Sequence, residues 1–153
     1  MKLSEILSPS CIRLDADATS KKRVLEAASE VLADNDENLS ARQVFECLFA
    51  REKLGSTGLG HGVAIPHGRL AGLDRTIGAF LRLPKGVDFD APDGEPVDLV
   101  FALLVPEEST EEHLQVLADI ASFFNSEKSR HALRVKISPE KARELLCQAG
   151  ARD

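Results

Sequence analysis

The chain has 153 residues, of which 43% are hydrophobic and 29% charged, and its formal net charge is −6. This balance is typical of one soluble globular domain and excludes a disordered chain. No apolar run approaches the ~20 residues of a membrane-spanning helix, and the N-terminal segment lacks the apolar core of a signal peptide, so we expect a single domain over residues 1–153, in the cytoplasm and without membrane insertion.

The distribution of charge and cysteine excludes further classes of function. Lysine and arginine are scattered, their densest cluster is only residues 21–23, and the chain has no Trp or Tyr. This pattern argues against nucleic-acid binding. Cys11, Cys47 and Cys147 lie far apart with no CxxC pair, so we interpret them as structural thiols rather than as a disulfide framework or a zinc site.

The N-terminal third alternates a short strand with two helices. Residues 11–14 are apolar enough for a strand, and residues 20–33 carry apolar side chains at helical spacing. The polar run 34–38 ends that helix. Ser40 then has a glutamine three residues later, which is capping-box spacing, and the helix that follows ends at Gly55.

The C-terminal half predicts two strands followed by three helices. Residues 76–83 have strand character, and residues 97–105 are almost continuously apolar, as in a strand buried on both faces. Residues 109–112 form a second capping box. Further helices are expected over residues 127–134 and from the Ser138–Pro139 cap to Gly150. Helices alternating with apolar strands predict an α/β fold in which helices cover both faces of one sheet.

The segment GSTGLGHGVAIPHGR, residues 55–69, is rich in glycine and holds two of the four histidines. It contains no dinucleotide fingerprint, P-loop or nucleophile elbow, and its GxxG does not have the flanks of a KH domain. His61 and His67 are six residues apart, which is not the spacing of a helical zinc site. A metal site would need His113 and an acid brought together by the fold.

The remaining chemistry is that of a single histidine. His67 lies between Pro66, which stiffens the local chain, and Gly68, which leaves the ring accessible. A neutral imidazole is a competent nucleophile at cellular pH, and its attack on phosphorus would give a phosphohistidine. The alternative is a loop histidine with a satisfied local hydrogen bond and no reactivity.

Four segments together resemble the enzyme IIA proteins of the phosphoenolpyruvate-dependent sugar phosphotransferase system. They are the glycine-rich segment, Arg51-Glu-Lys-Leu54 before it, the strand DLVFALLVP, and Glu112-His-Leu-Gln115. The likeness is to the fructose/mannitol class, and the ending AIPHGR is most similar to its nitrogen-regulatory branch. It covers residues 3–147 and implies the mannitol-type fold, a mixed central β-sheet flanked by helices on both faces in a single domain.

The resemblance also implies roles for individual residues. His67 is the expected phosphoryl acceptor, at Nε2. Arg51 is expected to balance the charge of the phosphoryl group, and His113 to hydrogen-bond the imidazole or the phosphoryl group. No metal and no cofactor is expected. His61 receives no role from the resemblance, and we expect it to face solvent or to lie behind the residues that touch the phosphoryl group.

Additional donors to the phosphoryl group are expected in the glycine-rich segment. Ser56, Thr57 and the backbone around Gly68 are the candidates, because hydroxyl and amide groups in such loops bind anions. An apolar docking patch around His67 is expected as well. Its candidate side chains are also candidates for the core: Leu59, Val63, Ile65 and Leu70.

The function implied by the resemblance is that of a phosphohistidine relay and regulator, counted with the transferases if it is counted as an enzyme. The expected donor is a histidine phosphocarrier protein. The expected targets are regulatory proteins of the potassium-transport or sensor-kinase type. The alternative is a sugar-specific enzyme IIA that passes phosphate to a separate transporter subunit. A homodimer is compatible with the sequence.

Overall fold

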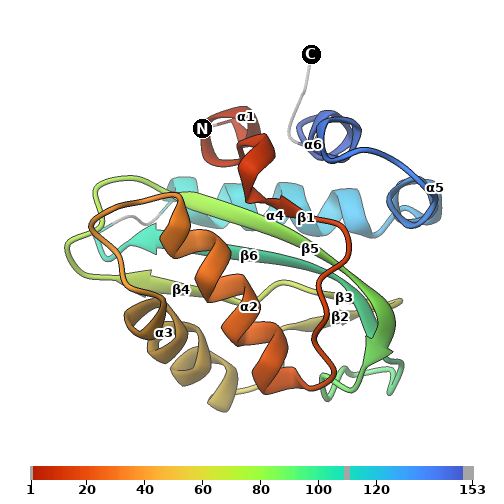
Figure 1. Cartoon of the computed structure of the whole chain (residues 1–153), viewed down its shortest axis with the longest axis horizontal. Helices are drawn as coiled ribbons and strands as arrows, with labels where there is room; N and C mark the ends of the chain where they lie inside the picture. The colour runs from red at the N-terminus through yellow and green to blue at the C-terminus, as the bar shows by residue number, and fades with distance from the viewer. Residues whose placement is uncertain (1, 109–110, 150–153) are drawn as a thin grey trace.

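A computed structural model describes residues 2–108 and 111–149, and in this part of the chain a mixed β-sheet carries helices on both faces (Figure 1). The strands are β1 (Ile12–Arg13), β2 (Gly58–Gly60), β3 (Val63–Ala64), β4 (His67–Leu70), β5 (Ile77–Val87) and β6 (Val97–Pro106). The helices are α1 (Leu3–Ile6), the 3-10 helix Pro9–Cys11, α2 (Lys21–Asp34), α3 (Ala41–Lys53), α4 (Glu111–Phe124), α5 (Glu127–Arg134) and α6 (Pro139–Leu146). The predicted fold class, a mixed sheet between two helical layers, is confirmed.

β6 is the central strand of the sheet. It runs antiparallel to β5 along one edge, and β5 in turn pairs in parallel with β1. Along its other edge β6 pairs in parallel with β3 and then with β4, while β2 closes the sheet against β3. Every residue from Leu99 to Val105 is buried. The continuously apolar pattern of this segment therefore reflects a strand that is covered on both faces.

α2 and α3 cover one face of the sheet, in orange and brown in Figure 1. Both begin at a serine N-cap: Ser20 Oγ accepts from Arg23 N–H at 3.1 Å, and Ser40 Oγ accepts from Gln43 N–H at 3.1 Å. Such caps satisfy a backbone donor that the helix itself leaves unpaired. The apolar stripe predicted for residues 20–33 is buried, as expected.

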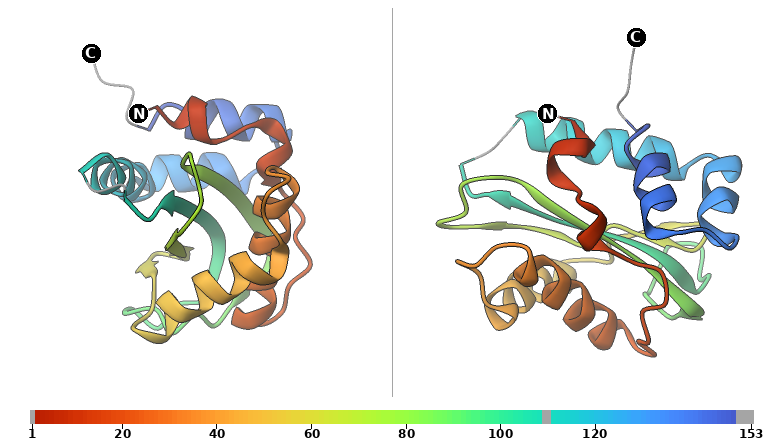
Figure 2. Two further views of the ribbon diagram at one scale, coloured as in Figure 1. Left: turned by 90° about the vertical axis from the view of Figure 1, so that its left-hand side faces the viewer. Right: turned by 45° about the horizontal axis from the view of Figure 1, so that its top comes forward.

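The opposite face is covered by α4, with α1, α5 and α6 outside it (Figure 2). Phe124 of α4 stacks on Phe80 of β5, with ring centroids 6.3 Å apart and both rings buried. Arg143 of α6 joins the two ends of the chain by donating to Leu7 O at 2.6 Å and Ser4 O at 3.1 Å. No helix in the part of the chain described here is both long and apolar enough to cross a membrane.

The glycine-rich segment differs from the sequence prediction, because much of it is strand. β3 and β4 follow one another along the same edge of β6, with Val63 opposite Leu99 and His67 opposite Leu103. Pro66 lies between them; it has no N–H to contribute, but its carbonyl accepts from Leu103 N–H at 2.9 Å. β6 thus pairs with two short segments that their glycine-rich surroundings did not mark as strands, because tertiary context decides strand formation more than local propensity does.

The ends of some strands and helices, and the exposure of some apolar side chains, also differ from what the sequence indicates. β5 extends to Val87 beyond the predicted 76–83, and α6 ends at Leu146. The expected end of that helix, Gly150, and the cap residue Ser109 lie outside the described residues. Two leucines at helix ends are exposed rather than buried: Leu54 is 84% exposed and Leu114 is 63% exposed. Both flank the candidate site.

Candidate functional site

A pocket between α3, β4 and the first turn of α4 contains the sequence-predicted residues Arg51, His67, Gly68 and His113. α3 and β4 lie side by side, so the pocket collects side chains from segments that are far apart in the sequence. Its lining residues are Gln43, Glu46, Cys47, Ala50, Arg51, Leu54, His67, Gly68, Arg69, Leu70 and His113.

His67, the first residue of β4, is half-buried in this pocket. Its Nδ1 lies 2.8 Å from Ile65 O. A carbonyl oxygen only accepts, so Nδ1 carries the proton and the neutral ring keeps its lone pair on Nε2. Burial lowers the pKa of His67 below its ordinary value and the positive charge of Arg51 adds to this, while the Ile65 hydrogen bond and Glu52 oppose it. The ring is therefore held as a neutral nucleophile.

His113 lies in the first turn of α4 and is only 5% exposed. Its ring centroid is 6.0 Å from that of His67, with the two planes inclined by 50°. Its Nδ1 is buried and has no hydrogen-bond partner in the described part of the chain, a situation that typically costs about 1–3 kcal/mol. Burial lowers the pKa of His113, and positive charge on His67 and Arg69 lowers it further.

Arg51, in the last turn of α3, supplies a cation to the pocket. Its Nη1 donates to Gly55 O at 2.9 Å, so the guanidinium also holds the backbone after the helix. No carboxylate among the described side chains, those of residues 2–108, 111 and 113–149, forms an ion pair with it. A guanidinium without a carboxylate partner is available to an anion at His67.

Gly68 sets the distance between the strand of His67 and the helix of Arg51. A Cβ atom at this position would lie 2.5 Å from Cys47 Sγ and 3.5 Å from Cys47 O. Cys47 Sγ also donates to Arg69 O at 3.2 Å, and burial raises the pKa of this thiol. Glycine is thus required for α3 to approach β4 closely enough for Arg51 and His67 to share a pocket.

The structure does not bring Ser56 and Thr57 into this pocket. Ser56 Oγ donates to Phe89 O at 2.7 Å, and Thr57 Oγ1 donates to Glu52 Oε1 at 2.5 Å. The buried Glu52 carboxylate also accepts from Thr57 N–H at 2.8 Å and pairs with Lys21 Nζ at 3.3 Å. These bonds fix the start of the glycine-rich segment, so the two hydroxyls act on the loop rather than on the pocket.

The apolar surface beside the histidines differs from the predicted one. Val63 and Ile65 are buried in the core, and the partly exposed Leu59 lines a different groove. Of the four side chains considered, only Leu70 lines the pocket. The exposed apolar side chains here are Leu54, in the pocket wall, and Leu114, which follows His113.

Arg69 is a pocket residue that sequence reasoning missed. It lies two positions after His67 on β4, and residues at this spacing in a strand point to the same face. The spacing of His67 and Arg69 in AIPHGR could have predicted this, but only if the segment had been identified as a strand rather than as a loop.

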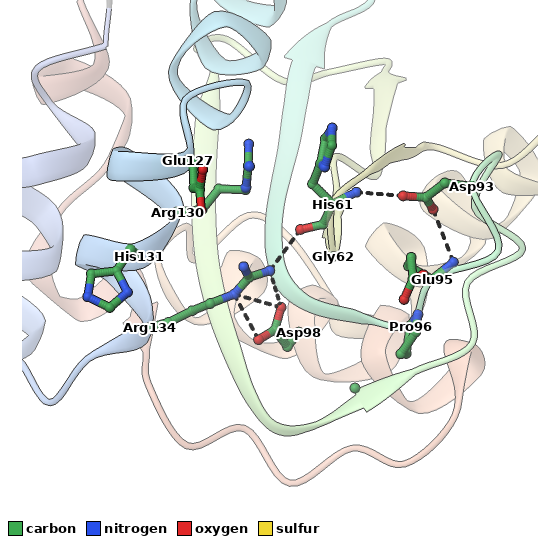
Figure 3. Close-up of a pocket in the computed structure, with 11 residues that line it drawn as sticks. His61, Gly62, Asp93, Glu95, Pro96, Asp98, Glu127, Arg130, His131 and Arg134 are labelled. Carbon is green, nitrogen blue, oxygen red and sulfur yellow. Dashed lines mark hydrogen bonds and ion pairs between the residues drawn. The ribbon is translucent and has the colours of Figure 1, made fainter.

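His61 lies in a separate groove that also contains His131 and Arg134 (Figure 3). Its backbone is in the left-handed region, with φ of 58°. The N–H donates to Asp93 Oδ2 at 2.8 Å, and the carbonyl accepts from Arg134 Nη2 at 2.8 Å. The side chain is exposed, as expected from the sequence, and it does not line the pocket of His67.

The pocket therefore offers a nucleophilic nitrogen, a second imidazole and guanidinium groups beside exposed leucines. Such a set suits reversible attachment of an anionic electrophile such as a phosphoryl group. No three His, Cys, Asp or Glu side chains gather as metal ligands among the residues that the structure describes.

The comparisons with known proteins agree with this arrangement. Residues 5–149 match the family model described as phosphoenolpyruvate-dependent sugar phosphotransferase system, EIIA 2. A nitrogen regulatory protein of Pseudomonas aeruginosa is 49% identical over 134 residues, 88% of this chain and 87% of the relative. The one from Escherichia coli K12 is 42% identical over 147 residues, covering 95% and 90%.

Two solved structures show the same fold. The nitrogen regulatory protein IIA-Ntr of Neisseria meningitidis superposes with a TM-score of 0.89 at 53% identity, covering 94% of this chain and 98% of that one. The mannitol IIA of Escherichia coli gives a TM-score of 0.75 at 26% identity, covering 92% and 98%. The family resemblance inferred from the glycine-rich segment is confirmed. This chain belongs to the EIIA 2 family of the phosphoenolpyruvate-dependent sugar phosphotransferase system.

Proposed function

We propose that this protein is a phosphohistidine relay and regulatory protein of the nitrogen type, in which His67 accepts a phosphoryl group from a histidine phosphocarrier protein. The observation that carries the proposal is the hydrogen bond of His67 Nδ1 to Ile65 O. It leaves Nε2 as the nucleophilic atom of a ring that shares its pocket with His113 and Arg51.

The transfer is a displacement at phosphorus between two imidazoles. The Nε2 lone pair of His67 forms the new N–P bond as the N–P bond of the donor breaks, and the departing electron pair returns to the donor ring. The proton on Nδ1 stays in place. Ile65 O then stabilises the positive charge that the attack delivers to the ring, because its hydrogen bond favours the charged form.

Positioning and charge neutralisation are the main contributions that a protein makes to such a transfer. Arg51 is placed to neutralise the phosphoryl oxygens. In this proposal His113, whose buried Nδ1 has no partner in the described residues, donates a hydrogen bond to a phosphoryl oxygen once the group is bound. The exposed Leu54 and Leu114 offer the carrier an apolar contact around the reacting atoms.

The regulatory output rests on the comparisons. Identity is higher with the nitrogen regulatory proteins, at up to 53% in the matches above, than with the mannitol IIA at 26%. We therefore assign regulation of potassium-transport or sensor-kinase targets to the protein, through binding that depends on the phosphorylation of His67. The competing role, phosphate transfer to the cysteine of a separate transporter subunit, is tested by offering such a subunit to the phosphorylated protein.

The test is one incubation with phosphoenolpyruvate, the first enzyme of the relay and a nitrogen-type carrier, read by intact mass. The wild-type protein should gain one acid-labile phosphoryl group, and His67→Ala should gain none. His61→Asn is the matched control, since asparagine tolerates the positive φ of that position, and it should be labelled as fast as wild type. Normal labelling of His67→Ala would refute the assignment.

A further inference from the structure

Arg69 and His67 face the same pocket from one strand. They are the third and first residues of β4, while Gly68 between them is buried against Cys47 of α3. The Arg69 backbone is fixed, because it pairs with Val105 of β6 and its carbonyl accepts from Cys47 Sγ at 3.2 Å. The base of the side chain is therefore held at a set distance from the His67 ring.

The guanidinium of Arg69, by contrast, is exposed and uncommitted. It forms no hydrogen bond or ion pair with the side chains that the structure describes, those of residues 2–108, 111 and 113–149, whereas Arg51 is held by Gly55 O. The acidic side chain in the pocket wall, Glu46, pairs with Arg42 at 3.2 Å. The guanidinium of Arg69 is therefore available to an anion in the pocket.

The two pocket arginines act on different histidines. Arg51, from α3, is a source of the positive potential at His67, and Arg69, from β4, is a source of the potential at His113. A phosphoryl group bound to His67 would sit between these two potentials. It carries about two negative charges on three oxygens, and one guanidinium satisfies at most two oxygens in bidentate fashion.

We propose that Arg69 is a second phosphoryl-binding arginine, which contacts the phosphoryl group on His67 from the side of His113 while Arg51 contacts it from α3. This inference rests on the proposed function. Arg51 and Arg69 then form a two-arginine clamp around the phosphoryl group. Arg69 binds that group and not the surface of the carrier protein. Arg69 forms and breaks no covalent bond and holds its proton throughout.

The test measures the phosphorylated protein itself, away from any carrier. Wild type, Arg69→Ala, Arg69→Lys and Arg23→Ala are phosphorylated and purified, and the pKa of the phosphohistidine is measured by ³¹P NMR over the pH range in which the N–P bond is stable. A nearby cation lowers that pKa. Loss of Arg69 should therefore raise the titration midpoint by about 0.7 pH unit, the value for one unit charge about 4 Å away in water. Arg69→Lys should fall between wild type and Arg69→Ala.

Arg23→Ala is the matched control, because Arg23 is exposed on α2 outside the pocket and its loss changes the net charge equally. Its midpoint should equal that of wild type. The forward transfer, followed in the same variants, should lose about tenfold in kcat/KM for Arg69→Ala, mainly in kcat.

The outcomes separate this inference from the proposed function. If wild type gains no phosphoryl group on His67, the proposed function fails, and with it the inference. If wild type is labelled but Arg69→Ala titrates like wild type, the proposed function stands and the two-arginine clamp is wrong. An unchanged midpoint with a raised KM alone would make Arg69 a contact for the carrier, which also overturns the inference.

Discussion

The rings of His67 and His113 lie with their centroids 6.0 Å apart, although one residue begins β4 and the other lies in the first turn of α4. β6 explains this approach. Its last residues pair with β4, His67 opposite Leu103 and Leu70 opposite Pro106, and α4 is the helix that follows β6 along the chain. The end of one buried strand therefore places both histidines at the same edge of the sheet.

Replacing His113 should slow phosphoryl transfer without preventing it. His113→Ala removes a buried imidazole beside the acceptor, and loss of one hydrogen-bonding group near developing charge typically costs about a hundredfold or more in kcat. His113→Gln keeps a donor and an acceptor and should recover part of the rate. Rapid-quench kinetics would measure this, with circular dichroism to check the fold. A wild-type rate in His113→Ala would contradict the supporting role.

Arg51→Ala should lower the transfer rate more than Arg51→Lys does. Lysine keeps the charge, but it cannot reproduce a bidentate contact to phosphoryl oxygens while holding Gly55 O. A drop of about 10–100-fold for the alanine variant corresponds to about 1.4–2.7 kcal/mol of lost transition-state stabilisation. The same kinetic assay measures both variants. Equal rates for the two would show that the retained charge contributes nothing, and a wild-type rate in Arg51→Lys would show that the bidentate geometry is unimportant.

Gly68→Ala should destabilise the fold through a clash with a single atom. The new Cβ would lie 2.5 Å from Cys47 Sγ, and such overpacking costs about 1–3 kcal/mol. Cys47→Ala removes that sulfur, so the double variant should be more stable than the sum of the two single changes predicts. Urea denaturation of the four proteins measures the coupling. Strict additivity would mean that the helix moves away instead, and that α3–β4 contact does not depend on Gly68.

The acceptor should remain neutral in mildly acid solution. Burial holds the pKa of His67 and of His113 below the value of about 6.5 for a free histidine. Phosphoryl acceptance should then persist as the pH falls through 6.5 and decline only at lower pH. Titration of the ring protons of His67 and His113 by NMR would test this. Midpoints at or above 6.5 would contradict the burial argument.

The lowered pKa values of His67 and His113 also determine how the stability of the fold changes with pH. Below about 6.5 the unfolded chain binds protons on these two histidines before the folded chain does, so acid favours unfolding. The stability that these two histidines contribute should be fully present above pH 6.5. It should be lost as the pH falls through their folded-state pKa values. A variant with glutamine at both positions should lose this part of the pH dependence, as measured by urea denaturation at several pH values.

The helices and the central strand could be predicted from the sequence, because the patterns that indicate them are local. Ser40 and Ser138 cap helices as predicted, each accepting from the backbone N–H three residues later. The continuous apolar run of β6 indicated a strand covered on both faces, which is what forms. Caps and periodicity are properties of a few neighbouring residues, so they do not depend on the rest of the fold.

The surroundings of His67 were harder to predict from the sequence, because they depend on pairing between distant segments. β3 and β4 form on the edge of β6 within a glycine-rich segment. Unless this segment is known to be a strand, the sequence does not show that His67 and Arg69 share a face. Leu54 and Leu114 continue apolar periodicities but lie outside the contact with the sheet. Ser56 and Thr57 were expected near phosphate, and their hydroxyls instead bond Phe89 O and Glu52.

The most direct test of the central claim is the position of the phosphoryl group on the His67 ring. After phosphorylation of ¹⁵N-labelled protein, correlation of the ³¹P resonance with the ring nitrogens identifies the bonded atom. The hydrogen bond from Nδ1 to Ile65 O predicts an N–P bond at Nε2 of His67, with Nδ1 still protonated. A phosphoryl group on Nδ1, or on the ring of His113 or His61, would contradict the account.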